Sequence, residues 1–97
     1  MVNYQIPEDL KDLIPGYILR RETDILELNL FKKSNDFDSI RKLAHRLTGN
    51  GSSFGFDRIS EIGAQLTHSA ERNDINTVTQ LIENLEGEVS KIKDKLS

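Results

Sequence analysis

The sequence has no cysteine and no tryptophan, and it has only two prolines, two tyrosines and four phenylalanines. Without cysteine, the chain can form no disulfide, no thiolate nucleophile and no cysteine zinc site. It also lacks any run approaching the roughly 18 apolar residues of a membrane span. Its start, Met1 to Gln5, lacks the basic and apolar regions of a signal peptide. We therefore expect a cytoplasmic protein with no membrane segment.

The chain also lacks an excess of positive charge. Thirteen lysines and arginines stand against 16 aspartates and glutamates, for a net charge of −3. This balance argues against nucleic-acid binding, which needs a basic surface. A length of 97 residues fits one domain spanning residues 1–97. A chain of this size has one modest core and little room for a large enclosed cavity.

The sequence is rich in helical periodicity, whereas alternation typical of strands is scarce. Pro15-Gly16, Ser34 to Asp36 and Gly51 to Phe56 are the expected interruptions or links between helices. The predicted helices span residues 7–14, 17–33, 37–52, 57–72 and 75–96. Short links favour antiparallel neighbours. The expected fold is therefore all-α: an antiparallel up-down four-helix bundle with a short additional N-terminal helix.

Each predicted helix has an apolar stripe that should face the core. In the helix over 17–33, the inward residues are Ile18, Ile25, Leu28 and either Phe31 or Leu30. The last helix has the most regular seam, with spacings of three and four residues: Ile75, Val78, Ile82, Leu85, Val89, Ile92 and Leu96. A bundle that closes on its own seams needs no second chain, so we expect a monomer.

His45 is the unusual residue of the helix over 37–52. At about 100° per residue, it points about 150° away from the stripe of Ile40, Leu43, Ala44 and Leu47. It should therefore face water. The residues expected around it lie on the same side of the helix or on its flanks: Arg41, Lys42, Arg46, Thr48, Gly49 and Ser52.

Gly49 follows His45 by one helical turn on the same face. A glycine inside a helix costs about 1 kcal/mol relative to alanine. One explanation is that the missing side chain leaves open space beside the imidazole for a phosphoryl group or its donor. The other is that Gly49 begins the exit of the helix, since Gly51 and Gly55 follow.

An exposed imidazole suits phosphoryl chemistry. Its reference pKa of about 6.5 leaves much of it neutral and nucleophilic near pH 7. It can attack an aspartyl phosphate and hold the phosphoryl group as a phosphoramidate. Arg41, Lys42 and Arg46 would offset the added negative charge. The plain alternative is an exposed histidine on a solvated basic face.

The run from Ala44 to Phe56, AHRLTGNGSSFGF, resembles the signature of histidine-containing phosphotransfer (HPt) domains. The resemblance implies that His45 accepts the phosphoryl group on the ring nitrogen farther from the backbone, and that Gly49 gives access to it. It also implies exchange with response-regulator receiver domains, with a hybrid histidine kinase as a further candidate partner. The receiver would supply Mg²⁺ and most of the catalysis. The chain itself would be a phosphocarrier with no cofactor and no complete active site.

Two positions depart from the family pattern. Thr48 stands where the family usually has a lysine that holds phosphoryl oxygens, and Arg41 or Arg46 is the nearest substitute. Thr67 stands 22 positions after the histidine, where a Gln or Glu often orients the ring. These departures leave open a degenerate module that binds a receiver or another signalling partner without accepting phosphate. A third reading is an unrelated helical bundle.

A metal site is not expected. His68 and Glu71 lie one turn apart, but di-iron bundles use paired Glu-x-x-His motifs that face the core. This single reversed pair lies on a polar side. Gly63, between apolar positions, is expected to pack closely against the helix that carries His45.

Overall fold

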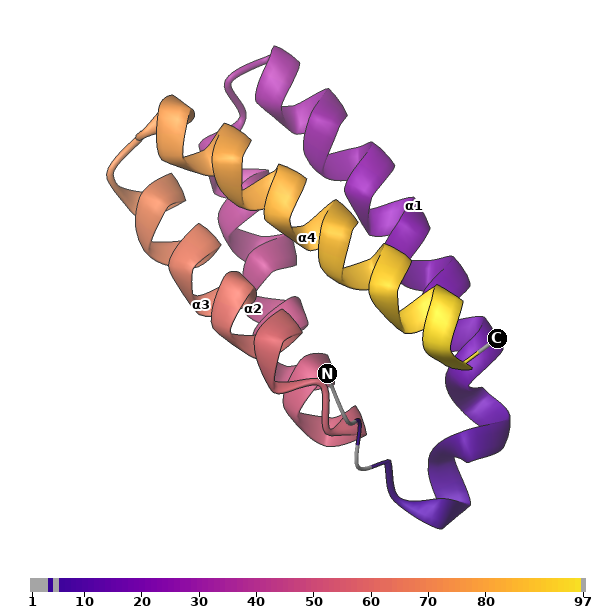
Figure 1. Cartoon of the computed structure of the whole chain (residues 1–97). Helices are drawn as coiled ribbons and strands as arrows, with labels where there is room; N and C mark the ends of the chain where they lie inside the picture. The colour runs from indigo at the N-terminus through magenta and orange to yellow at the C-terminus, as the bar shows by residue number, and fades with distance from the viewer. Residues whose placement is uncertain (1–3, 5, 97) are drawn as a thin grey trace.

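The computed structural model describes Tyr4 and residues 6–96, and this part of the chain is helical and contains no strand. A 3-10 helix, η1 (Glu8–Leu13), leads into four α-helices: α1 (Ile14–Lys33), α2 (Phe37–Phe54), α3 (Asp57–Glu71) and α4 (Ile75–Leu96). Figure 1 shows these helices running side by side in an antiparallel bundle. Contacts are most extensive between α2 and α3, and α4 packs on both α3 and α1. The predicted fold class is confirmed.

The start of the chain lies largely outside the described residues, so the expectation about a signal peptide stays a prediction. Within Tyr4 and residues 6–96, no helix is both long enough and apolar enough to cross a membrane.

The interruption predicted at Pro15-Gly16 is wrong. Residues 8–13 form a 3-10 helix, and α1 begins at Ile14 with Pro15 in its first turn. A proline is well tolerated there because the first backbone N–H groups of a helix have no partner within the helix. The proline therefore starts the helix instead of separating two helices.

The end of α2 is later than predicted. The helix continues through Gly51 and Ser52 to Phe54, and Gly55 then takes a left-handed conformation with φ of 81°. Two backbone bonds close the turn: the Phe56 amide donates to the Gly51 carbonyl at 2.8 Å, and the Gly55 amide donates to the Ser52 carbonyl at 3.1 Å. This is a Schellman ending, for which glycine is the preferred residue.

A close approach between backbones joins α2 to α3. A Cβ atom added to Gly63 would lie 2.7 Å from the Thr48 amide nitrogen and 2.9 Å from the Ala44 carbonyl oxygen. A Cβ added to Gly51 would lie 2.6 Å from the Ser60 amide nitrogen. The predicted packing role of Gly63 is confirmed, and Gly51 has the same role nearer the turn.

An aromatic cluster holds the C-terminal end of α2 against α1. The buried Tyr17 ring lies 4.4 Å from Phe54 and 5.1 Å from Phe56, measured between ring centroids. The Tyr17 hydroxyl donates a hydrogen bond to Asn50 Oδ1 at 3.0 Å, and the Arg21 guanidinium stacks over the tyrosine ring at 4.6 Å. Burial raises the pKa of Tyr17. These contacts fix the glycine-rich end of the helix that carries His45.

The apolar face of α1 agrees with the prediction, and the structure decides between the two alternatives given for its last inward residue. Ile18 and Leu28 are buried, and Ile25 and Phe31 pack on the core from partly buried positions. Leu30, the stated alternative to Phe31, points outward and is 63% exposed.

Candidate functional site

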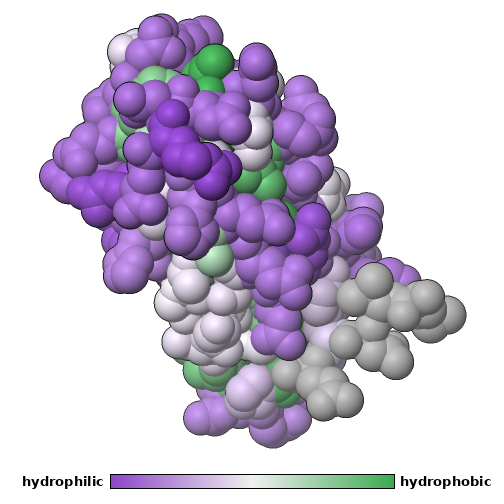
Figure 2. Space-filling model, turned by 90° about the vertical axis from the view of Figure 1, so that its left-hand side faces the viewer, coloured by the Kyte–Doolittle hydropathy of each residue, from purple (hydrophilic) through white to green (hydrophobic). Residues whose placement is uncertain are grey.

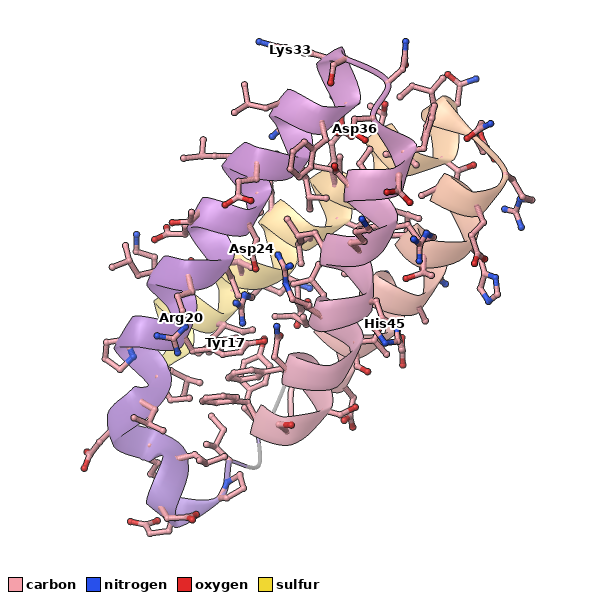
Figure 3. All side chains as sticks on the ribbon, turned by 180° about the vertical axis from the view of Figure 1, so that it is seen from behind. Tyr17, Arg20, Asp24, Lys33, Asp36 and His45 are labelled. Atoms are coloured by element: carbon pink, nitrogen blue, oxygen red, sulfur yellow. The ribbon has the colours of Figure 1, made fainter. Side chains whose placement is uncertain are left out.

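Helix α2 fixes the direction of the His45 side chain. Its N-terminus is capped by Asp36, whose carboxylate accepts hydrogen bonds from the Ser39 amide at 3.1 Å and the Ser39 hydroxyl at 2.6 Å. Ala44 and Leu47 are fully buried beside His45, so rotation of the helix would expose core residues. His45 is exposed, and Figure 3 shows it on the side of α2 away from α1. The predicted exposure is confirmed.

The His45 ring forms no polar contact with the other described residues. In the part of the chain that the structure describes, no side chain or backbone group forms a hydrogen bond or ion pair with it. Thr67 lies at the position where the family often has an orienting Gln or Glu, but it donates its hydroxyl to the Gly63 carbonyl of its own helix at 2.9 Å. The structure therefore leaves both ring nitrogens of His45 available to a partner.

Thr48 turns toward α3. Its hydroxyl donates to the Ala44 carbonyl at 3.2 Å, and its side chain is half-buried against the Gly63 position. A threonine hydroxyl donor already used within the helix provides neither a charge nor a spare proton for a phosphoryl oxygen.

The basic flank of His45 is partly neutralised by Asp38. Arg41 Nη2 lies 2.9 Å from one Asp38 oxygen, and Lys42 Nζ lies 3.1 Å from the other. The hydrogen bond from Arg41 is the main cause that lowers the pKa of Asp38, followed by that from Lys42. Arg46 is exposed and has no ion pair among the described residues. Sequence reasoning missed Asp38, although its spacing of three and four residues from the two cations could have revealed it.

Gly49 faces open space. The helix continues past it to Phe54, and no atom lies within 4 Å of an added Cβ. This differs from Gly51 and Gly63, where the protein's own backbone excludes a side chain. Of the two explanations given from sequence, the space beside the imidazole agrees with the structure and the helix exit does not. None of the described residues requires a glycine at position 49.

The surface that continues from Gly49 consists of small side chains. Ser52 is exposed, and its hydroxyl lies 3.0 Å from that of Ser60 on α3. The Ser60 hydroxyl also donates to the Thr48 carbonyl at 2.8 Å. Figure 2 shows a pale area of intermediate hydropathy over α2 and α3 near their connecting turn, below a strongly hydrophilic region. The surface next to Gly49 therefore carries no large side chain at Ser52 or Ser60.

His68 and Glu71, weighed from the sequence as a metal pair, are not part of a larger group of ligands in the described structure. Within Tyr4 and residues 6–96, no group of three or more potential metal ligands comes together. The His68 imidazole lies beside Glu71, with Nδ1 to Oε1 at 3.6 Å. The site thus consists of one imidazole on a rigid helix with open space around it.

Comparison with known proteins gives one result. The family model described as Hpt domain matches residues 7–95, which is nearly the whole chain. No curated protein and no solved structure matches the chain.

Proposed function

The chain belongs to the Hpt domain family, and we propose that it relays a phosphoryl group between receiver-domain aspartates and His45. Membership supports a histidine phosphotransfer role in a phosphorelay. The observation that carries the assignment to this residue is the exposed, unpaired imidazole of His45 next to the open position at Gly49.

The proposed step is an in-line transfer. The lone pair of His45 Nε2 attacks the phosphorus of a receiver's aspartyl phosphate, a P–N bond forms, and the P–O bond to the aspartate breaks. The aspartate leaves as a carboxylate, and Nδ1 keeps the ring proton. The reverse reaction returns the phosphoryl group to a second receiver. The chain thus acts as a phosphocarrier.

The partner supplies the charge that this site lacks. Thr48 is neutral, and Arg41 and Lys42 are already paired with Asp38. In this proposal the receiver brings Mg²⁺ for the phosphoryl oxygens, and this chain needs no cofactor. Its own contribution is to present the nucleophile without obstruction. A cytoplasmic location and a hybrid histidine kinase as a second partner belong to the same proposal.

The test is a transfer assay with a panel of phosphorylated receiver domains. The proposal expects label on this chain that is labile in acid and stable in base, as a phosphoramidate is. A second candidate is a degenerate module that docks a receiver without accepting phosphate, and Thr48 in place of lysine favours it. Receiver binding with no transfer over long incubation would identify that module instead.

Charge at Asp38 should control how fast a receiver associates. Asp38→Asn removes the carboxylate that pairs with Arg41 and Lys42, which leaves two cations free beside His45. We expect faster association with an acidic receiver pocket, and a steeper decrease as salt is added. Stopped-flow association at two ionic strengths measures both effects.

Glu8→Gln is the matched control for this experiment. It also removes one negative charge and frees a lysine, because Glu8 pairs with Lys11 at 2.8 Å on η1. An equal increase in both variants would show that total charge acts on association, and would contradict a local role for Asp38.

Thr48→Lys should strengthen the phosphorylated state. The half-buried Thr48 side chain runs along α3, and a lysine stem can follow this path while its ammonium reaches water. We expect a severalfold gain in transfer rate or phosphohistidine lifetime in the transfer assay. Thr48→Gln provides similar length without charge, and an equal gain there would show that charge is not the cause.

A further inference from the structure

A stripe of leucines lies on the outer face of α1, away from the core. Leu19, Leu26 and Leu30 are 65%, 67% and 63% exposed, the highest values among the large apolar residues of the described chain. At about 100° per residue, they fall within about 40° of one another on the helix. Three such side chains in one line are unusual for a surface that only meets water.

The charges on the two flanks of this stripe differ. On the flank next to α4, Glu22 is paired with Lys93 at 3.1 Å. On the other flank, Arg20 and Glu27 lie seven residues apart, and neither has an ion pair in the described part of the chain. Asp24, one turn from Arg20, is bound to Arg21 at 2.8 Å. The Arg20 guanidinium and the Glu27 carboxylate are therefore left for an external partner.

We infer that this face binds a second copy of the chain, with the two α1 helices antiparallel. A two-fold axis brings the same flank of both helices together. If the axis passes between Thr23 and Asp24, Arg20 of each copy lies level with Glu27 of the other copy. The dimer then contains two such pairs. The same axis places Leu19 between Leu26 and Leu30 of the second copy, as knobs-into-holes packing requires. A parallel pair would instead place the Arg20 flank of one copy beside the Glu22 flank of the other, and Glu22 is already paired with Lys93.

Gly16 allows the two helices to approach at the ends of this contact. It lies on the same flank as Arg20, and an added Cβ there would meet only the Arg20 side chain, at 3.4 Å. In the antiparallel pair, Gly16 lies near Leu30 of the second copy. One helix of 20 residues is about 30 Å long and buries less than the roughly 800 Å² per partner of a standard interface. The dimer should therefore form at micromolar concentration or above.

The pairing leaves the phosphotransfer site open. His45 lies on the side of α2 away from α1, as Figure 3 shows. The inference does not depend on the proposed function, and it replaces the monomer expected from the sequence. That expectation assumed that every apolar seam faced the core, whereas this stripe does not.

Sedimentation velocity from about 5 to about 500 μM tests the dimer. We expect a monomer–dimer equilibrium that Leu26→Glu abolishes while the circular dichroism spectrum stays unchanged, because Leu26 is on the surface. Arg20→Glu and Glu27→Arg should each weaken the dimer about tenfold, since two ion pairs become repulsive. The double variant with Arg20→Glu and Glu27→Arg should restore the affinity of the dimer. A monomer at the highest concentration, or a double variant no better than the single ones, overturns the inference.

Single cysteines test the orientation, because the chain has none of its own. Thr23→Cys lies beside the axis and should be cross-linked by a short bis-maleimide. Lys33→Cys lies nine and a half residues from the axis, so its two copies are separated by about 28 Å along the helices and should not react. A parallel pair would bring both positions level with their own copies, so cross-linking through Lys33→Cys overturns the antiparallel arrangement.

Discussion

His45→Gln is expected to abolish phosphorylation by a charged receiver domain and to leave the helical content and thermal midpoint unchanged. The ring is exposed and has no hydrogen bond or ion pair in the described structure, so its removal costs the fold little. Glutamine has no nitrogen lone pair capable of attacking phosphorus. Transfer of radiolabel from the receiver, followed at alkaline pH, measures the loss.

His68→Gln is the matched control. His68 is the only other histidine of the chain, and its side chain is 74% exposed on α3. The same chemical change at that position should leave labelling intact. Label that persists in His45→Gln and disappears in His68→Gln would show that the accepting residue is misassigned.

Gly63→Ala is expected to destabilise the fold by about 1–3 kcal/mol, as overpacking of an interior does. The new methyl group would meet the Thr48 amide and the Ala44 carbonyl at less than 3 Å. Backbone atoms of a packed helix cannot move aside as a flexible side chain can. The α2–α3 pair would have to separate, and Ala44 precedes His45 directly. Chemical denaturation with urea measures the change in free energy of unfolding.

Gly87→Ala separates this effect from helix propensity. Gly87 lies inside α4, and no atom is within 4 Å of an added Cβ. Alanine should therefore stabilise the protein by about 0.5–1 kcal/mol, because it reduces the entropy of the unfolded chain. Equal effects at residues 63 and 87 would contradict the close backbone packing of α2 on α3.

Periodicity predicted the arrangement of the helices because burial of an apolar stripe determines which face points inward. The same reasoning predicted the exposure of His45 and the packing of Gly63. Helix ends depend on capping residues and on the backbone conformation of proline and glycine, which the spacing of apolar residues does not report. The prediction of an interruption at Pro15 is wrong because proline also fits a first helical turn. The end of α2 was predicted too early because Gly51 precedes the true C-terminal glycine, Gly55.

Side-chain pairing around the site was harder to predict. Arg41 and Lys42 were expected to serve a phosphoryl group, but Asp38 binds both from one turn earlier. Thr67 was expected near the ring, but its hydroxyl satisfies a carbonyl of its own helix. Each of these outcomes depends on competition between several partners within reach, and the sequence alone does not rank those partners.

The nitrogen that carries the phosphoryl group provides the most direct test of the central proposal. After transfer from a receiver domain to ¹⁵N-labelled protein, phosphorus–nitrogen coupling in the NMR spectrum identifies the bonded atom. We expect one phosphoramidate, on Nε2 of His45. Phosphate on any other residue, or none on a chain that demonstrably binds the phosphorylated receiver, would contradict it.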